Sequence, residues 1–276
     1  MKHIFIFLLF ITNILSSYEL SICTIFQNEA PYLKEWIEFH VEHGVQHFYL
    51  YNNNSTDDYK IVLKPYVDNK LVDIFDWSET YKTGPEFFLI QCKVYLDCCQ
   101  KIKHKDKWLA VIDSDEFLFS PIEKDLKKIL KNYENYGAVQ VNWVLYGTSN
   151  VNVPHGEKLI NHLLYRSELS FIHNQIMKSI VRPISVTGCK SPHFFEFHPF
   201  IKAVNESKEV VTGKGSHPIS VNKLRINHYW SRDLDYFYNE KIPRRVNFGY
   251  PYEEAIDLES QMNDIYDPIL KTKSIE

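Results

Sequence analysis

The chain has 276 residues, of which 45% are hydrophobic, 15% aromatic and 24% charged. This composition is typical of a globular protein that is long enough for one good-sized core, and we expect a single domain. The formal net charge is -4. The scattered Lys and Arg residues form no basic stripe with interleaved aromatic residues, so we expect no nucleic-acid partner. An anionic substrate would have to be met by local groups or by a metal.

Residues 2–15, KHIFIFLLFITNIL, begin with a positive charge and continue as an apolar run that is short for a membrane span. This pattern is typical of a signal peptide, with Ser16 and Ser17 as small residues before a cleavage point. Leu15 fits such a cleavage point poorly, which leaves an uncleaved anchor as the alternative, and a buried first strand or helix is a third. We expect residues 1–17 to be a signal peptide or membrane anchor. The predicted location is therefore the secretory pathway, the periplasm or a membrane.

The five cysteines are an odd number, and Cys92, Cys98 and Cys99 lie in one stretch, QCKVYLDCCQ, that predicts a helix. Adjacent cysteines rarely bridge each other, and the sequence contains no C-x-x-C pair. Neither a disulfide framework nor a zinc knuckle is indicated. We expect these cysteines to be small buried apolar residues.

The first half of the chain alternates between apolar strand patterns and amphipathic helix patterns. Strands are predicted over residues 19–26, 46–51, 71–77 and 108–113, and helices over residues 30–44, 57–67 and 85–104. Gly44 is the expected C-cap of the first helix. The strand over 108–113 is apolar without alternation, as in a strand covered on both faces. These alternations predict an α/β fold with a doubly wound, mostly parallel, Rossmann-like sheet.

The second half has a looser pattern. Residues 125–137 predict a helix and residues 137–147 a strand, followed by loops rich in His, Pro and aromatic residues. Residues 226–241 predict the end of a strand and then a helix, with Asp233 as its N-cap. No internal repeat or linker divides the chain.

Polar residues follow each predicted strand of the first half. Ligands of a doubly wound sheet bind outside the carboxyl ends of its strands, so we expect one crevice to collect these residues. As separate short stretches they are also common turn or strand-capping residues. The candidates for contacts with a nucleobase, ribose or phosphate in this crevice are Asn28, Glu29, Asn52, Asn53, Asn54, Asp76 and Asp113.

Asp113 and Asp115 follow the buried strand at a spacing that lets their side chains converge once the backbone turns. A divalent cation would relieve their repulsion and present open positions to phosphate oxygens. Oxygen ligands favour Mg²⁺ or Mn²⁺ over zinc. The alternative is a solvated loop that caps the helix after Pro121. The sequence has no EF-hand spacing and no glycine-rich phosphate loop, so a metal would carry most of the phosphate recognition.

Four residues of the second half are further candidates. His228, in NHYW, could complete the metal shell, although a lone His beside aromatic residues is more often a core residue. His193 and Glu196 are candidates for proton transfer, and Lys178 is a candidate for phosphate contact, together with Arg182 in the same segment. Core packing is the alternative for the aromatic residues that could stack on a sugar face. These are Trp143, Tyr146 and Trp230.

Several of these stretches together resemble glycosyltransferase family 92 and the closely related family 2-like enzymes. The resemblance covers nearly everything from Ser21 to about Lys241. Its most specific elements are NEAPYLKEWIEFH (28–40) and IDSDEF (112–117), and it continues in NNNSTDD (52–58), VNWVLYGTS (141–149), MKSIVRP (177–183) and INHYWSR (226–232).

The resemblance implies a GT-A fold with residues 18–276 as the catalytic domain. It also implies transfer of a sugar, often galactose, from a nucleotide diphosphate donor with inversion and with Mn²⁺ as the usual metal. We expect a UDP-sugar as donor and a glycan, glycoprotein or glycolipid as acceptor. Residue by residue, it implies that Asp113 and Asp115 hold the metal and the donor diphosphate and that His228 is a further metal ligand. Glu29 and residues 52–54 match nucleoside-binding strand ends.

Two other classes of protein fit parts of the pattern. A D-x-D phosphoryl-transfer hydrolase would use the first Asp as nucleophile, but Phe117 stands where such enzymes usually have Thr or Val. A non-catalytic carbohydrate-binding module would bind glycans without a donor. In the leading hypothesis Glu196, His193 or Asp233 deprotonates the acceptor hydroxyl, and Glu116 is a structural neighbour.

Overall fold

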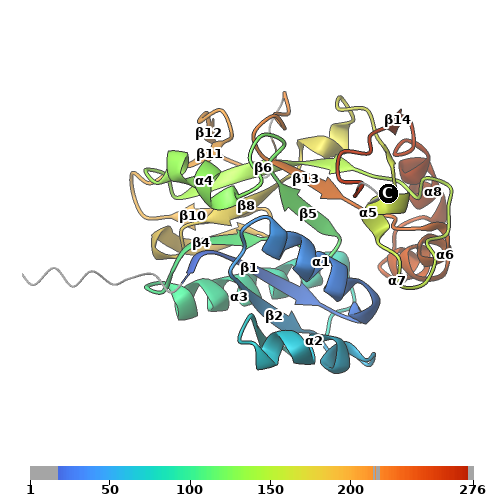
Figure 1. Ribbon diagram of the computed structural model, residues 1–276, viewed down its shortest axis with the longest axis horizontal. Coiled ribbons are helices and arrows are strands. Elements are labelled where there is room, and N and C mark those ends of the chain that lie inside the picture. The colour runs from blue at the N-terminus through green and yellow to red at the C-terminus, as the bar shows by residue number, and fades with distance from the viewer. Residues whose placement is uncertain (1–17, 214, 216–217, 273–276) are drawn as a thin grey trace, which may run out of the picture.

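The computed structural model describes residues 18–213, 215 and 218–272 (Figure 1). In these ranges no helix is long and apolar enough to cross a membrane. The helix over Gly84–Ile102, for example, has 19 residues but is interrupted by charged side chains such as Lys93 and Asp97. This finding contradicts the predicted secretory, periplasmic or membrane-associated location. That prediction depended on the apolar segment in residues 1–17, which lies outside the described residues.

Strands and helices alternate through the first half of the chain and become short in the second half. The strands are β1 Tyr18–Phe26, β2 His47–Asn52, β3 Val72–Asp76, β4 Asp106–Val111, β5 Glu116–Phe119, β6 Ala138–Leu145, β7 Tyr165–Arg166, β8 Met177–Val181, β9 Val186–Ser191, β10 Phe194–Phe197, β11 Ala203–Asn205, β12 Val210–Val211, β13 Arg225–His228 and β14 Ile265–Tyr266. The helices are α1 Ala30–Glu42, α2 Tyr59–Asp68, α3 Gly84–Ile102, α4 Leu126–Leu130, α5 Leu159–His162, α6 Leu234–Tyr236, α7 Ile242–Asn247 and α8 Tyr252–Ser260. Every strand and helix predicted for residues 19–113 is present.

A ten-stranded sheet forms the centre of the molecule, in the order β12-β11-β6-β8-β4-β1-β2-β3; β13 joins it by pairing with β6, and β5 pairs with β13. Strands β3, β2, β1 and β4 are parallel. Strand β8 runs antiparallel to both of its neighbours, β4 and β6. The predicted mostly parallel, doubly wound sheet in a single domain is confirmed. The antiparallel β8 is an addition to that prediction.

The two faces of the sheet are covered by different helices. Residues of α1, α2 and α4 belong to one apolar core, whereas α3 packs on the other face together with the hairpin β9–β10. Strand β4 contributes to both cores, which explains why it is apolar without alternation. Cys92, Cys98 and Cys99 of α3 are buried as predicted.

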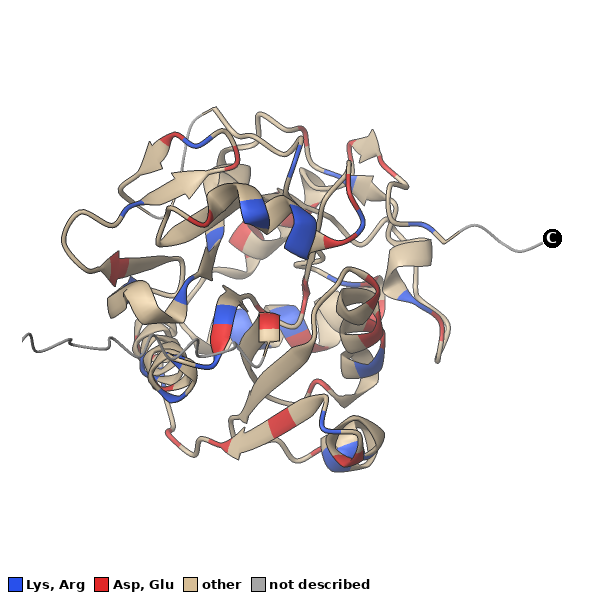
Figure 2. Cartoon of the chain, turned by 60° about the vertical axis from the view of Figure 1, so that its left-hand side comes forward, with Lys and Arg blue, Asp and Glu red and all other residues tan. Residues whose placement is uncertain are grey.

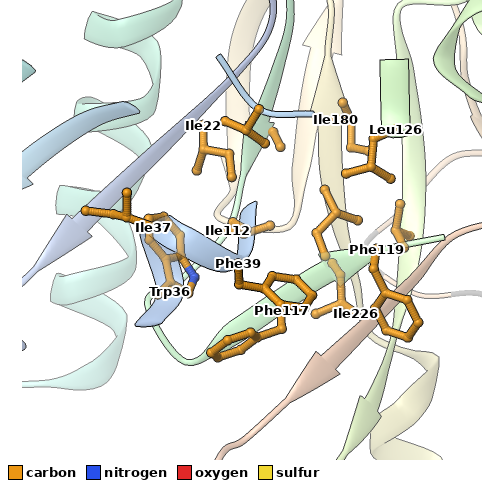
Figure 3. Packing of buried hydrophobic residues seen from close by; sticks show 14 of the residues in the cluster. Ile22, Trp36, Ile37, Phe39, Ile112, Phe117, Phe119, Leu126, Ile180 and Ile226 are labelled. Carbon is orange, nitrogen blue, oxygen red and sulfur yellow. The ribbon is translucent and has the colours of Figure 1, made fainter. Parts of the chain in front are cut away.

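Helix α1 packs its apolar side against β5, a short strand that the sequence pattern did not predict (Figure 3). The rings of Phe39 and Phe117 meet at 5.0 Å between centroids. Trp36 is fully buried and donates its indole N–H to the carbonyl of Glu116 at 2.8 Å. Replacing such a buried aromatic side chain by Ala costs about 3–5 kcal/mol. Helix α1 therefore fixes the position of the chain just after residue 115.

His40 is buried in the same core and is held in one neutral form. Its Nδ1 lies 2.7 Å from the carbonyl of Trp36, so this nitrogen must donate. Its Nε2 accepts the backbone N–H of Leu118 at 3.1 Å. Burial lowers the pKa of His40 to about 3. Helix α1 ends shortly afterwards, and Gly44 has the φ of +94° expected of a glycine just after a helix end.

Two predicted helices of the second half differ from the structure. Helix α4 stops at Leu130 and continues as a 3₁₀ turn over Lys131–Tyr133, because the following Asn and Tyr residues are weak helix formers and β6 begins just after Gly137. The predicted helix after residue 233 starts as predicted, with Asp233 accepting the N–H of Tyr236. It then widens into a π-helical turn over Phe237–Lys241 before α7. Pro243 lacks the N–H that a continuous α-helix would need there.

Candidate active site

The carboxyl ends of β1, β2 and β3 meet at one edge of the sheet. In the parallel register Phe26 lies beside Asn52, and Asn52 lies beside Asp76. The amide of Asn52 donates to the carboxylate of Asp76 at 2.9 Å, and its oxygen accepts the N–H of Ser55 at 2.9 Å. The structure thus brings these predicted residues together.

Asparagine side chains link the loops that follow β1, β2 and β3. Asn28 accepts the N–H of Thr56 at 2.8 Å, and Asn53 donates to the carbonyls of Trp77 and Glu79. Asn28 and Asn54 both have a φ of 56°, a left-handed conformation that Asn tolerates better than most residues. These side chains form a rigid rim at the carboxyl edge.

Glu29 also lies at this rim, but it is buried and paired. Its carboxylate forms an ion pair with Arg232, which is only 1% exposed. The Arg232 guanidinium lies 3.7 Å from the ring centroid of Tyr32 and 4.4 Å from that of Tyr236. This stack joins the start of α1 to the segment after β13.

Asp113 follows β4 and is surrounded by donors from two elements, β8 and α3. The ammonium of Lys178, on β8, lies 2.7 Å from one carboxylate oxygen. Gln91 and the hydroxyl of Tyr95, both on α3, lie 3.2 and 3.3 Å from the other oxygen. Because β8 is antiparallel to β4, the beginning of β8 lies at the carboxyl edge, and this places Lys178 beside Asp113. Arg182, at the other end of β8, donates instead to the carbonyl of Glu134.

Glu116 is fully buried beneath this pair. It accepts the N–H of Asp113 at 3.0 Å, and its other oxygen lies 3.6 Å from Lys178. Burial raises the pKa of Glu116 well above its ordinary value, and the charges of Asp113 and Asp115 add to this effect against the opposing Lys178. Burial lowers the pKa of Lys178, but the two acidic neighbours overcome it and raise that pKa. Lys178 therefore forms an ion pair with Asp113 directly above the buried carboxyl of Glu116.

Asp115 points to a different set of residues. His228 Nε2 lies 3.4 Å from one of its oxygens, and Lys241 Nζ lies 3.6 Å from the other. Strand β13 places His228 there, because it pairs with β5 so that His228 lies opposite Glu116. Burial alone would raise the pKa of Asp115, but the charges of His228, Lys241 and Arg232 hold it well below its usual range.

An aromatic row runs from His228 toward the hairpin β9–β10. The Trp143 ring lies 4.4 Å from the His228 ring and 5.2 Å from the His193 ring, between centroids. His193 is half-buried, and its Nδ1 lies 3.1 Å from the carbonyl of Met177. Glu196 lies farther along the hairpin, where it is exposed and pairs with Lys190 at 3.4 Å. Of the three candidate bases, Asp233 accepts the backbone N–H groups of Val153 and Tyr236, and His193 is nearer than Glu196 to the Asp115–His228 pair.

Several residues of this site were not predicted. The basic ones come mainly from the segment after β13, where Lys241 and Arg245 lie 4.7 and 5.3 Å from the ring of Trp230. Figure 2 shows basic and acidic positions interleaved along the chain. The run KIPRR at 241–245 was the available sequence signal. No sequence signal indicated Gln91 and Tyr95, because they lie on the inner side of an ordinary amphipathic helix.

The class of protein follows from comparison with known families. Residues 16–264 match the model of glycosyltransferase family 92. The chain belongs to this family.

Similar proteins include a family 92 protein of Ricinus communis, 27% identical over 238 residues, which cover 83% of this chain and 38% of that protein. A family 92 protein of Arabidopsis thaliana is 26% identical over 244 residues, again 83% of this chain and 38% of the relative. The chain thus spans well under half of these relatives' length. Among solved structures, a mannosyltransferase from Pyrobaculum calidifontis in complex with GDP-Man and Mn²⁺ has a TM-score of 0.42 and 13% identity, covering 92% of this chain and 67% of that one.

Proposed function

We propose that the chain is a metal-dependent glycosyltransferase that moves a sugar from a UDP-sugar to a hydroxyl group of a glycan, glycoprotein or glycolipid acceptor, with inversion. The pairing of Asp115 with His228 at the carboxyl edge of the sheet, next to Asp113, carries this proposal. Family membership supports the transferase class. Galactose is the first sugar to test, because two galactan β-1,4-galactosyltransferases of Arabidopsis thaliana each match 41% of the chain.

The residues around Asp115 fit a divalent cation such as Mn²⁺ or Mg²⁺. An imidazole nitrogen of His228 and a carboxylate oxygen of Asp115 lie 3.4 Å apart, and both are suitable ligands. Among the described residues no group of three or more His, Cys, Asp and Glu could hold a metal. Asp115 and His228 would therefore be the main protein ligands, with Asp113 held by Lys178. When bound, the cation would neutralise charge on the nucleoside diphosphate.

The basic side chains after β13 would bind the diphosphate beside that cation. Lys241 is buried next to Asp115. Arg245 packs against the rings of Trp230 and Tyr250. Positive groups that are already in place stabilise a departing diphosphate without reorganising during the reaction. The nucleoside would lie against the rim formed by residues 28–29, 52–54 and Asp76.

His193 is the general base in this proposal. Its Nδ1 faces the carbonyl of Met177, so this nitrogen carries the hydrogen and the lone pair is on Nε2. In an inverting reaction the acceptor oxygen attacks the anomeric carbon opposite to the departing diphosphate, and the base takes the hydroxyl proton. Trp143, between His193 and His228, offers an aromatic surface for the sugar.

A panel of UDP- and GDP-sugars incubated with Mn²⁺ and neutral oligosaccharides tests the proposal. We expect release of free nucleoside diphosphate and a lengthened acceptor, both abolished by a chelator and restored by Mn²⁺. Asp115→Asn is the matched variant, since it keeps the shape of the side chain and removes its charge. Equal turnover by Asp115→Asn would overturn the metal assignment. Glycan binding without donor hydrolysis or transfer would favour a carbohydrate-binding module.

A further inference from the structure

A groove of about 1280 Å³ opens beside the candidate active site. One wall consists of α1 and α2, and the other consists of residues 153–157 and the segment from Asp233 to Arg244. Its inner end is lined by residues 27–29, which directly follow β1, so the groove reaches the carboxyl edge of the sheet. Pockets for single small molecules usually measure about 300–1000 Å³. The groove has room for more than one sugar ring.

Aromatic and apolar side chains form broad surfaces along both walls. Tyr66 on α2 donates its hydroxyl to Glu38 on α1 at 3.1 Å, which fixes its ring against the groove. Ile61 on the same wall is 72% exposed. Tyr32 and Tyr236, from opposite walls, meet edge to face with ring centroids 5.7 Å apart. Such surfaces suit the apolar faces of sugar rings.

The polar lining of the groove is strongly acidic. Seven Asp and Glu residues line it, against one Lys and one Arg. Glu35 is occupied by the backbone N–H groups of Leu159 and Ile160, which start α5. By contrast, the side chains of Glu240 and Lys34 are exposed and make no hydrogen bond or ion pair with the described part of the chain. Carboxylates accept hydrogen bonds from hydroxyl groups, and their combined field repels anions.

The groove and the candidate active site share a wall. Tyr32 and Tyr236 line the groove and also enclose the Arg232 guanidinium. Arg232 pairs with Glu29, which belongs to both the groove and the carboxyl edge. A molecule in the groove would therefore lie next to the place where the sugar is transferred.

We propose that this groove binds the non-reacting units of an uncharged oligosaccharide acceptor and excludes glycans that carry carboxylate, sulfate or phosphate groups. This inference rests on the proposed function, because it names the acceptor class of the same enzyme. The aromatic surfaces hold the sugar rings, and the carboxylates accept from the sugar hydroxyl groups. The negative charge of the carboxylates repels anionic glycans and so favours uncharged ones.

Calorimetric titration of the whole chain with cellotetraose, β-1,4-galactotetraose and tetragalacturonate tests the proposal. We expect at least one neutral tetrasaccharide to bind at least about tenfold more tightly than tetragalacturonate, a difference of about 1.4 kcal/mol. Tetralysine, added as a fourth probe, tests a cationic peptide as the occupant instead. Tighter binding of tetralysine or of tetragalacturonate than of both neutral sugars would overturn the proposal.

Variants place the binding in this groove. Ile61→Asp changes an exposed side chain and should keep the fold, and Tyr66→Ala removes one aromatic surface. Both should weaken binding of the neutral tetrasaccharide by about tenfold. Glu240→Lys should reduce the discrimination against tetragalacturonate, whereas Asp68→Lys, on α2 but outside the groove, should leave it unchanged. Unchanged affinity in both Ile61→Asp and Tyr66→Ala would overturn the assignment.

Hydrolysis of the donor without acceptor separates this proposal from the proposed function. Ile61→Asp should hydrolyse a nucleotide sugar at the rate of the parent chain. If the parent chain hydrolyses the donor but binds neither neutral tetrasaccharide, the groove assignment fails and the proposed function stands. The parent chain could instead bind a neutral tetrasaccharide, with weaker binding in Ile61→Asp, and hydrolyse no donor. In that case the proposed function fails, and the groove is a glycan-binding site.

Discussion

Glu29 and Arg232 lie 203 positions apart in the chain, and their side chains form a buried ion pair. Glu29 follows the first strand of the sheet, whereas Arg232 follows β13. The Arg232 guanidinium also packs against the rings of both Tyr32 and Tyr236. The segment that carries Lys241 and Arg245 is thus fastened to the carboxyl edge by a contact that excludes water.

Glu29→Gln should lower the free energy of unfolding by about 3–5 kcal/mol, because it leaves the charge of Arg232 buried without a partner. Urea unfolding followed by circular dichroism measures this change. Glu42→Gln removes an exposed carboxylate that pairs with Lys124 and should change the stability by no more than about 0.5 kcal/mol. A loss below about 1 kcal/mol in Glu29→Gln would show that the pair does not hold the two segments together.

Glu116→Gln should change kcat by less than about tenfold, whereas loss of a general base costs about 10²–10⁴-fold. The physical reason is that the carboxyl of Glu116 is fully buried, burial raises its pKa, and one of its oxygens only accepts the N–H of Asp113, so an amide of similar shape can replace it. Glu116→Ala should cost about 1–3 kcal/mol of stability, because the N–H of Asp113 loses its acceptor. A drop of kcat in Glu116→Gln as large as that of a base variant would identify Glu116 as catalytic.

Lys241→Met should weaken the binding of UDP in the presence of Mn²⁺ by about tenfold or more. The reason is the removal of a buried amine beside Asp115, whose pKa burial lowers to about 7 and which an adjacent diphosphate would hold in its charged form. Isothermal titration with UDP measures the effect, and Lys64→Met, which removes a side chain that is 71% exposed, is the matched control. The same affinity in both variants would exclude Lys241 from the diphosphate site.

His193→Gln should lower kcat by about 10²–10⁴-fold with little change in the Kd of UDP, because a general base acts on the acceptor hydroxyl and not on the nucleotide. Glu196→Gln should keep kcat close to that of the parent chain, since Glu196 is exposed and pairs with Lys190. Steady-state kinetics with saturating donor and acceptor measures both variants. The reverse outcome would transfer the role of base to Glu196.

The protein should lose stability in acid through His40. Its pKa is about 3 in the folded chain and about 6.5 in the unfolded chain. The unfolded chain therefore binds the proton first. The stability that neutral His40 contributes is fully present above pH 6.5. As the pH falls from 6.5 toward 3, the free energy of unfolding decreases by up to about 1.4 kcal/mol per pH unit.

Urea titrations between pH 4 and pH 7.5 measure this dependence. His40→Gln has no proton to gain at this position, so its stability should vary less with pH over the same range than that of the parent chain. Parallel curves for the two proteins would contradict the role of His40.

The sequence predicted the parts of the fold that depend on local pattern. The four parallel strands and three helices up to residue 113 have clear periods, and the ends of these strands carry most of the candidate residues. The contact between Asp115 and His228 could be predicted only through the family resemblance, because no local pattern relates a strand end to a position more than a hundred residues later.

The remainder of the site depends on tertiary placement. Lys178 reaches Asp113 because β8 runs antiparallel, and the direction of a short buried strand leaves no trace in its composition. Glu29 was predicted at a nucleoside-binding position, and its buried partner Arg232 was not predicted. The basic run at 241–245 was visible, but only the π-helical turn brings Lys241 to Asp115.

Strand β8 also constrains how the protein can fold during synthesis. It lies between β4 and β6 but follows both of them in the sequence. Until residues 177–181 leave the ribosome, β4 has an unpaired edge, and an open edge of that kind can pair with other chains. A fragment that ends before β8 should therefore aggregate, and the parallel half that carries Asp113 should not fold as an independent unit.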